Sequence, residues 1–181
     1  MRVVAGELRG RRIDSPRTDA TRPTTDKVRE AVFNALSSMD AVVGARVVDA
    51  YAGTGALGIE ALSRGAAHCV FIERDPGALA VLRANIDRLG LSPRCTVLAS
   101  DALGALAGQR GVDLVLADPP YGFDQWGRLL EGVEAGTVVL ESDNPIDGPD
   151  RWTVVRQRRY GRTFVAILRP GPPVEGTVEG E

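Results

Sequence analysis

The stretch RVVDAYAGTGALG (Arg46–Gly58) decides the fold of this 181-residue chain. It opens on an apolar run that ends at Asp49, passes through Gly53-x-Gly55-x-x-Gly58, and leads into the helix-compatible IEALSRG. A strand, a glycine turn and a helix in this order predict the first half of a βαβ unit, with a nucleotide-sized ligand over the turn. Glycine lets the backbone approach such a ligand and adopt a positive φ. The free N–H groups at the start of the helix then face the polar groups of the ligand.

The rest of the chain alternates apolar runs with amphipathic segments, which predicts a largely parallel α/β sheet. Residues 1–15 alternate apolar and polar side chains around two glycines, which predicts a small hairpin or arm. Residues 170–181 have the composition of a disordered tail. Strands are expected at 46–50, 69–73, 95–99, 112–117 and 137–141, helices at 21–38, 56–64, 76–89 and 123–132 and just after Asp101, and a final hairpin at 152–158 and 162–168, turned at Tyr160-Gly161.

Composition limits the classes of protein to which the chain belongs. Its length suits one α/β domain with a real core, and 44% apolar and 25% charged residues are typical of globular proteins. Cys69 and Cys95 lie in apolar runs and are expected to be buried thiols. A single histidine, His68, makes a histidine-based metal site unfavourable, and we expect no metal. Because we find neither a transmembrane-length run nor a signal-peptide core, we expect a cytoplasmic protein without membrane contact, acting as a monomer.

The distribution of charge is more informative than the net charge of −2. Residues 1–18 and 151–169 concentrate arginine, whereas acidic side chains gather in 131–150 and in the tail. Two basic segments on a mildly acidic body indicate a local footprint for a polyanion. We therefore expect a basic N-terminal arm (1–18), a central domain (19–169) and the tail (170–181). The arginines expected to contact that polyanion are Arg9, Arg11, Arg12, Arg156, Arg158 and Arg159.

Two cofactors fit the glycine turn, and the rest of the chain separates them. With Glu73 at about the expected distance, the glycines also match the dinucleotide fingerprint. A dinucleotide enzyme would more often add a second βαβαβ half and a substrate domain, for which this chain has no residues left. Parallel β/α alternation that ends in an antiparallel hairpin is typical of methyltransferases that use S-adenosylmethionine (SAM). A glycine-rich turn without any ligand is the third interpretation.

Acidic side chains fall at the ends of four successive predicted strands, at the edge where doubly wound sheets bind ligands, and they are Asp49, Glu73, Asp101 and Asp118. Glu73 is placed to accept hydrogen bonds from two ribose hydroxyls. Asp101 would accept from an adenine amino group, and Asp49 with the glycine turn would face the methionine moiety. Taken singly, Asp49 and Asp101 also suit helix caps. The helix over 21–38 would bring Pro23–Thr25 to the edge of the cofactor. The candidate cofactor contacts are Thr24, Asp49, Ala52, Gly53, Gly55, Glu73, Arg74, Asp101, Ala102 and Asp118.

The tetrapeptide Asp118-Pro119-Pro120-Tyr121 follows the fourth predicted strand and is the candidate catalytic motif. An exocyclic amine of a nucleobase is a poor nucleophile because its lone pair is delocalised into the ring. The Asp118 carboxylate and the Pro119 carbonyl would hold its N–H bonds and favour a pyramidal nitrogen aimed at the methyl group. The prolines fix φ, and Tyr121 offers an aromatic face to an unstacked base. Alignment supplies most of the rate, so this chemistry needs neither a metal nor a covalent nucleophile.

The motif (Asp/Asn/Ser)-Pro-Pro-(Tyr/Phe/Trp) is that of methyltransferases acting on adenine N6, guanine N2 or a glutamine amide. Within that group, residues 1–169 resemble the RsmD-type bacterial 16S rRNA guanine-N2 methyltransferases. The segments that carry the resemblance are RVVAGELRGRRI, RPTTDKVREAVFNAL, DAYAGTGALGIEALSRGA, FIERD and DPPY, in that order. Tyr51 departs from the family, which more usually has Phe or Cys there.

The resemblance implies a class I SAM-dependent methyltransferase fold, with a mostly parallel seven-stranded sheet, an antiparallel last strand and an N-terminal hairpin arm. It implies methylation of N2 of guanine 966 in 16S rRNA, in the assembled or assembling small ribosomal subunit. It also implies catalytic and base-stacking roles for Asp118 and Tyr121, and cofactor contacts for Glu73 and Asp101.

Two other functions stay open from the sequence. One is the same chemistry on another amine, namely adenine N6 in DNA or RNA, or a glutamine amide in a protein. Against DNA, the chain has no separate target-recognition domain, so recognition would depend on the subunit surface or on RNA shape. The other is a non-catalytic SAM- or RNA-binding module in ribosome assembly, which the intact motif at 118–121 disfavours.

Overall fold

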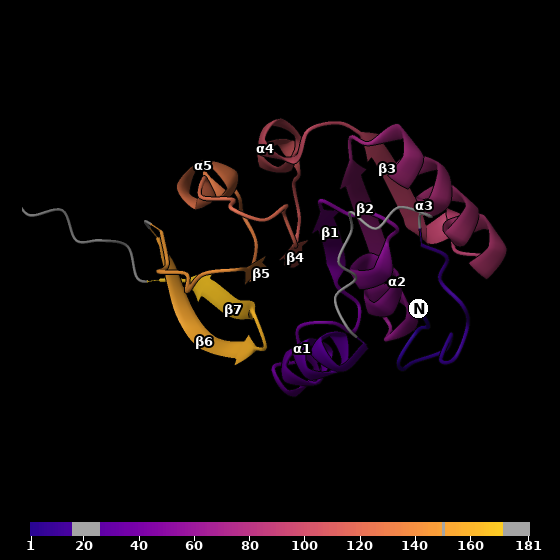
Figure 1. The fold of residues 1–181 in the computed structure, drawn as a ribbon, viewed down its shortest axis with the longest axis horizontal. Helices are drawn as coiled ribbons and strands as arrows, with labels where there is room; N and C mark the ends of the chain where they lie inside the picture. The colour runs from indigo at the N-terminus through magenta and orange to yellow at the C-terminus, as the bar shows by residue number, and fades with distance from the viewer. Residues whose placement is uncertain (16–25, 150, 172–181) are drawn as a thin grey trace, which may run out of the picture.

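The computed structural model describes residues 1–15, 26–149 and 151–171, and this part of the chain forms three layers (Figure 1). The middle layer is a seven-stranded sheet in the order β3-β2-β1-β4-β5-β7-β6. Strands β1 to β5 run parallel, whereas β7 is antiparallel to β5 and to β6. The predicted fold class is therefore confirmed. The strands are β1 (Arg46–Ala50), β2 (His68–Glu73), β3 (Cys95–Ala99), β4 (Leu114–Ala117), β5 (Thr137–Ser142), β6 (Trp152–Tyr160) and β7 (Thr163–Pro170).

Helices cover both faces of the sheet, which is why the central strand β4 is apolar along its whole length. On one face α1 (Asp26–Ser38), α2 (Ala56–Ser63) and α3 (Pro76–Leu89) pack with the N-terminal residues into one apolar cluster. On the other face α4 (Ala102–Ala105) and α5 (Trp126–Leu130) cover a second cluster. Figure 1 shows α4 and α5 on the opposite side of the sheet from α1 and α2. Among the described residues, no helix has the length and apolar character to cross a membrane.

Local sequence signals account for most of the element boundaries. The N-cap of α3 is Asp75, whose side chain accepts a hydrogen bond from the N–H of Ala78, and Pro76 occupies the first turn. The helix ends at Gly90, which adopts a left-handed φ of 71° as the predicted cap. The prediction for Cys95 was wrong. Its side chain is half-buried because β3 is an edge strand, whereas Cys69 on β2 is buried as expected.

Several predicted boundaries differ from the structure. β4 begins at Leu114, and α5 is confined to Trp126–Leu130, shorter than the helix predicted over 123–132. The final hairpin is longer than predicted, since β6 continues to Tyr160 and β7 continues to Pro170. The alternation of apolar and polar residues fades where arginines occupy successive positions, so the sequence does not mark the true end of β6.

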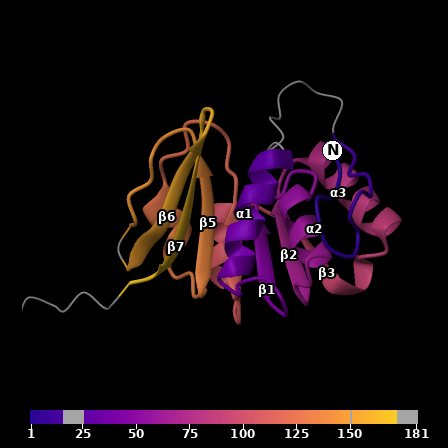
Figure 2. The same ribbon diagram turned by 90° about the horizontal axis from the view of Figure 1, so that it is seen from below.

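The N-terminal arm was predicted over residues 1–18, of which 16–18 lie outside the described residues, and its described part (residues 1–15) packs on the face of the sheet that carries α1, α2 and α3. Val3 and Ile13 are buried, at 2% and 0% exposure. The predicted hairpin is reduced to a single antiparallel bridge between Arg2 and Arg12. Figure 2 shows this indigo segment beside α2 and α3, far along the sheet from β6 and β7.

A buried ion cluster holds the backbone of the arm. Glu60 on α2 is fully buried, and its carboxylate accepts hydrogen bonds from the N–H groups of Val4 at 2.8 Å and Ala5 at 3.0 Å. The same carboxylate lies 2.8 Å from Nε of Arg64 and 3.4 Å from Nε of the fully buried Arg29. Buried charges are stable only when they are paired and hydrogen-bonded. The arm is therefore part of the fold.

Candidate active site

The register of the parallel strands brings the predicted acidic positions to one edge of the sheet. Ala50 at the end of β1 pairs with Ile72 on β2 and with Ala117 on β4. Glu73 at the end of β2 pairs with Ala99 on β3. The carboxyl ends of β1 to β4 therefore lie side by side, as in other doubly wound sheets that bind ligands there. The residues that this register collects at the carboxyl edge are Asp49, Glu73, Asp101 and Asp118.

The turn after β1 contains three residues with left-handed backbone angles. They are Tyr51 (φ 63°), Gly53 (φ 54°) and Gly55 (φ 85°). A Cβ on Gly53 would meet nothing within 4 Å, so this glycine leaves open space at the carboxyl edge. Any other residue in place of Gly55 would have to adopt the left-handed φ, and its Cβ would lie 2.5 Å from Cδ1 of Leu82, so it would be strained and would displace the Leu82 side chain. Because non-glycine residues rarely adopt a positive φ, Tyr51 stores strain of about 1–3 kcal/mol.

Glu73 holds the turn from the β2 side. Its Oε2 accepts a hydrogen bond from the N–H of Gly53 at 2.8 Å, and its Oε1 accepts from the N–H groups of Arg74 and Asp75 at 2.7 Å each. A carboxylate offers about four acceptor positions, so these bonds leave one at Oε2. If Glu73 receives two ribose hydroxyls, as predicted, it must exchange one backbone bond for a bond to the ligand.

Asp49 lies beneath the turn and is only 1% exposed. Its Oδ2 accepts a hydrogen bond from the N–H of Gly58 at 2.8 Å, which fixes the first turn of α2. Burial raises the pKa of this carboxyl well above its ordinary value, and the charges of Asp118 and Glu73 raise it further, against the effect of the Gly58 N–H. The structure therefore gives Asp49 the cap-like position that the sequence left open.

Asp101 and Arg74 form an ion pair at the outer side of the site. Nη1 of Arg74 lies 2.9 Å from Oδ2 of Asp101, and both side chains are substantially exposed. Oδ1 of Asp101 accepts from the N–H of Leu103 and caps α4, while Ala102 beside it is buried. An exposed pair of this kind contributes at most about 1 kcal/mol. A ligand amine can therefore displace Arg74 from Asp101 at small cost.

The motif at residues 118–121 begins directly after β4 and rises out of the sheet. Asp118 is half-buried, the first proline is buried and the second is exposed. Tyr121 is 64% exposed, so a large part of its ring is accessible from solvent. The loop is tied to the end of β5, because the N–H of Gly122 lies 3.3 Å from Oδ2 of Asp143. The loop thus combines a partly shielded carboxylate with an accessible aromatic side chain.

A row of aromatic rings beside this loop was not predicted from the sequence. The ring centroids of Tyr51 and Phe123 are 5.7 Å apart, and those of Phe123 and Trp126 are 4.7 Å apart, both in edge-to-face geometry. The Tyr51 hydroxyl is buried and has no hydrogen-bond partner among the described residues. Burial raises the pKa of Tyr51 to about 12, and the charge of Asp101 acts in the same direction against that of Arg74. The sequence indicated Tyr51 only as a departure from the family.

The predicted RNA-contacting arginines lie in two places. Arg159 pairs with Phe164, which pairs with Ser142 at the end of β5, so the tip of the β6–β7 hairpin lies at the carboxyl edge. The turn of the arm lies at the other end of α2, where the N–H of Glu7 donates to the carbonyl of Ser63 at 2.8 Å. The structure therefore brings Arg158 and Arg159 to the same edge as the site, but not Arg9 and Arg11. Thr24 lies outside the described residues.

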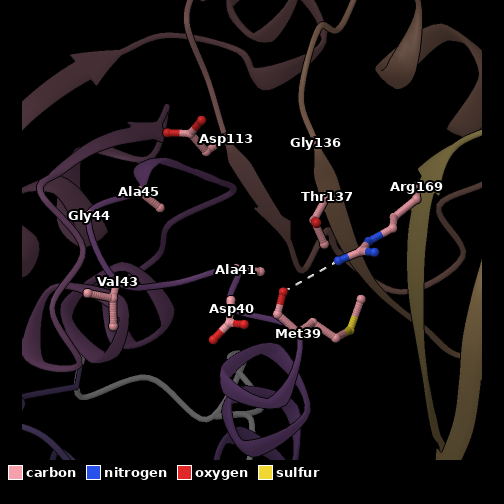
Figure 3. Close-up of a pocket in the computed structure, with 10 residues that line it drawn as sticks. All are labelled: Met39, Asp40, Ala41, Val43, Gly44, Ala45, Asp113, Gly136, Thr137 and Arg169. Carbon is pink, nitrogen blue, oxygen red and sulfur yellow. Dashed lines mark hydrogen bonds between the residues drawn. The ribbon is translucent and has the colours of Figure 1, made fainter.

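A hollow of about 400 Å³ lies at the opposite edge of the sheet (Figure 3). Its lining includes Asp113 and Thr137, at the amino ends of β4 and β5, and Arg169 on β7. Nη2 of Arg169 lies 3.5 Å from the carbonyl of Met39. None of the predicted site residues lines this hollow, so it is separate from the candidate site. The described residues contain no cluster of histidine, cysteine and acidic side chains suited to a metal ion.

The carboxyl edge fits SAM in charge, and the glycine turn leaves room for a ligand beside its backbone. The charges of Glu73 and Asp118 lie close enough to act on the buried Asp49. Such a cluster favours a cationic ligand, and SAM carries a sulfonium centre and an ammonium group. The open side of Gly53 allows close approach of the ligand to the backbone, and the acceptor position left on Glu73 suits a hydroxyl donor.

Comparisons with known proteins agree with this geometry. Residues 1–169 match the family model described as "Conserved hypothetical protein 95". The chain is 37% identical over 186 residues to the putative rRNA methyltransferase YlbH of Bacillus subtilis (strain 168), covering 93% of this chain and 98% of that protein. It is 41% identical over 181 residues to ribosomal RNA small subunit methyltransferase D of Escherichia coli (strain K12), covering 93% and 89%. A solved structure titled as the putative methyltransferase yhhF from Escherichia coli superposes with a TM-score of 0.80 at 33% identity, covering 94% and 98%.

Proposed function

The chain belongs to the RsmD-type family of small-subunit ribosomal RNA methyltransferases, and from that premise we propose that it transfers a methyl group from SAM to the exocyclic N2 amine of a guanine in 16S rRNA. By its resemblance to the family, the target is guanine 966. The proposed substrate is the assembled or assembling small subunit, and the protein acts on it as a cytoplasmic monomer. The observation that carries the proposal is the convergence of the glycine turn, the strand-end carboxylates and the motif at 118–121 on one sheet edge.

The cofactor is proposed to lie over the carboxyl ends of β1 to β3. Glu73 would accept hydrogen bonds from the ribose hydroxyls, in exchange for one of its backbone bonds. Asp101 would accept from the adenine amino group after Arg74 moves aside, and the backbone at Ala102 would meet the ring edge. The open side of Gly53 would face the methionine moiety, with Asp49 acting from below the turn.

The motif at 118–121 is proposed to prepare the target amine. When bound, SAM supplies an electrophilic methyl group on a sulfonium centre. The Asp118 carboxylate and the Pro119 carbonyl would accept the two N–H bonds of the amine, which directs its lone pair away from the ring and toward that methyl group. The exposed ring of Tyr121 would stack on the flipped guanine. Alignment of this kind needs no covalent intermediate.

The RNA is proposed to bind across the carboxyl edge, with Arg156, Arg158 and Arg159 on one side of the target base. Arg9, Arg11 and Arg12 of the arm would contact more distant phosphates. Because phosphate contacts release counterions, affinity for the RNA should fall steeply with salt. Thr24 remains a proposed contact at the edge of the cofactor.

Analysis of the methylated product tests the reaction. The purified protein is incubated with labelled SAM and with isolated small subunits, free 16S rRNA, duplex DNA or a release-factor protein. Nucleosides and peptides are then identified by mass spectrometry. The proposal expects N2-methylguanosine in ribosomal RNA. N6-methyladenosine or methylglutamine as the product would replace the guanine assignment, and SAM binding without any product would favour a non-catalytic module.

A substitution at Asp118 tests the catalytic assignment. Removal of one preorganised hydrogen-bonding group typically lowers kcat by about 10²–10³-fold, and Asp118→Ala should fall in that range. Asp118→Asn, which keeps one acceptor oxygen, should retain more activity. Asp124→Ala is the matched control, because Asp124 is an exposed carboxylate in the same loop. Parental activity in Asp118→Ala would refute the role of this residue.

A further inference from the structure

The side-chain amide of Asn85 joins three parts of the molecule that are distant in sequence. Asn85 lies on α3 and is fully buried. Its Oδ1 accepts hydrogen bonds from the N–H of Asp14 at 2.9 Å and from Nη2 of Arg88 at 2.7 Å. Its Nδ2 donates to the carbonyl oxygens of Asp14 and Thr54, both at 3.1 Å. A primary amide has two donor hydrogens and two acceptor lone pairs, so every polar group of this side chain is in use.

Thr54 connects Asn85 to the turn proposed to bind the cofactor. It stands between Gly53 and Gly55, both with left-handed backbone angles. Glu73 holds this turn from the β2 side through the N–H of Gly53. Asn85 holds it from the α3 side through the carbonyl of Thr54. A turn with several left-handed residues keeps its shape only while contacts with the surrounding structure fix its backbone. Loss of the hydrogen bond to Glu73 or of the hydrogen bond to Asn85 should therefore make the turn more mobile.

Asp14 connects Asn85 to the N-terminal arm. Asn85 forms hydrogen bonds with both backbone groups of Asp14, and this pair of hydrogen bonds fixes the orientation of the amide plane. Arg88 strengthens the junction, since its Nη1 donates to the carbonyl of Arg12 at 2.8 Å and its Nη2 lies 3.4 Å from the Asp14 carboxylate. If the end of the arm moves away, Asn85 is left with unpaired buried groups and must reorient.

We propose that Asn85 is a positioning residue that makes the shape of the glycine turn, and hence the affinity for SAM, depend on the docked arm. The inference rests on the proposed function, because it assumes that this turn binds SAM. The arm carries arginines on its exposed side, so ribosomal RNA that engages it also acts on Asp14. Coupling between two binding sites is reciprocal. RNA bound at the arm therefore changes the affinity for SAM, and SAM changes the affinity for RNA by the same factor.

The test compares Asn85→Ala and Asp14→Pro with Ser63→Ala in the full chain. Asp14→Pro removes the N–H that binds Asn85 and leaves α3 intact. Ser63→Ala removes the hydroxyl that accepts from Leu8 and donates to Ala5, so it weakens the arm at the end remote from Thr54. The Kd of SAM is measured by calorimetry well below each melting temperature, alone and with a 16S rRNA fragment that contains the target guanine. KM for SAM and kcat at saturating SAM are also measured.

The expected result is a Kd and a KM for SAM raised by about tenfold in Asn85→Ala, within the usual range of coupling between sites, with kcat at saturating SAM within twofold of the parent. Asp14→Pro should show the same pattern to a smaller extent, and Ser63→Ala should keep parental affinity despite a lower melting temperature. The RNA fragment should shift the parental Kd but not that of Asn85→Ala.

Parental SAM affinity in both Asn85→Ala and Asp14→Pro would overturn the inference and leave the proposed function intact. An equal loss of affinity in Ser63→Ala would also overturn it, because general destabilisation would then explain the effect. If Asn85→Ala fails to fold, Asp14→Pro decides the question. If the parental protein does not bind SAM at all, the proposed function fails, and the inference fails with it.

Discussion

The N-terminal arm and the hairpin of β6 and β7 are both rich in arginine, yet they are built in opposite ways. The arm buries Val3 and Ile13, and two of its backbone N–H groups donate hydrogen bonds to the buried carboxylate of Glu60. Its arginine side chains therefore lie on the outer side of a segment that is packed against the domain. The hairpin forms the free edge of the sheet, with Arg158 and Arg159 exposed close to its tip. The turn of the arm lies away from the candidate site, whereas the tip of the hairpin lies at the same edge.

The difference teaches that charge in a sequence does not specify what a basic segment does. In the arm, the features that matter most are polar side chains on α2 and α3, which fix the backbone whatever the outer side chains are. In the hairpin, the sheet register places the charge, and charged residues also discourage pairing of the exposed edge with another chain. We expect substitutions in the arm to affect stability first, and substitutions in the hairpin to affect RNA affinity first.

Glu60→Ala should have the largest effect on stability. It removes the acceptor for two N–H groups of the arm and leaves the fully buried Arg29 without this carboxylate. Loss of one partner of a buried ion pair typically costs about 3–5 kcal/mol. Chemical denaturation measures the free energy of unfolding, and hydrogen exchange at Val4 and Ala5 reports release of the arm. Glu30→Ala, at an exposed position of α1, is the control and should stay within about 0.5 kcal/mol of the parent. A similar small change in Glu60→Ala would mean that the arm is not anchored in this way.

Gly6→Ala should have an intermediate effect on stability. Comparing it with Gly10→Ala separates the cost of backbone strain from the cost of contact with α2. Gly6 and Gly10 both have positive φ, at 84° and 80°. A Cβ on Gly6 would lie 1.8 Å from the carbonyl oxygen of Ser63, whereas a Cβ on Gly10 would meet nothing within 4 Å. In both Gly6→Ala and Gly10→Ala, the left-handed angle should lower the free energy of unfolding by about 1 kcal/mol. Overpacking should lower it by about 1–3 kcal/mol more in Gly6→Ala alone. Thermal unfolding of the two variants gives the difference, and equal losses would show that the turn does not rest on α2.

Neutralising the hairpin should have the smallest effect on stability and a clear effect on RNA binding. The double variant Arg158→Ala with Arg159→Ala should stay within about 0.5 kcal/mol of the parent in unfolding. Each lost phosphate contact should reduce the slope of log affinity against log salt by about 0.7–0.9. The matched variant, Arg9→Ala with Arg11→Ala, should change the slope less. Filter binding to a 16S rRNA fragment over a salt series measures both. A larger change for the arm pair would reverse the assignment of the two regions.

The sequence predicts the sheet well because its signals are local. Apolar runs with caps and glycine turns fix β1, β3 and the ends of α3, and parallel pairing accounts for the gathering of the strand-end acidic residues at one edge. The buried arm was not predicted, because its contacts with Glu60 join residues 55 and 56 positions apart. No local pattern reports such a contact.

Asn85 escaped prediction for a related reason. Asn85 follows Leu82 on the buried face of α3, and a polar residue on an apolar face is the one signal that the sequence offered. Its partners, Asp14 and Thr54, become evident only when the chain is folded. The sequence supplied one reason for glycine at position 55, a positive φ, which the structure bears out, and the contact that a Cβ would make with Leu82 of α3 is a second reason that only the fold shows.

One irregularity in β6 decides which way its charges point. Val154 pairs with Leu168 and Arg156 pairs with Ile167, so Val155 is an extra residue in the ladder. Side chains on a strand alternate with a period of two, and the insertion reverses the parity of all that follows. Trp152 accordingly packs against the α4–α5 cluster, whereas Tyr160 packs against the cluster of α1 to α3. Inserting or deleting one residue here would therefore move the arginine side chains that follow from one face of the sheet to the other, although none of those arginines is itself replaced.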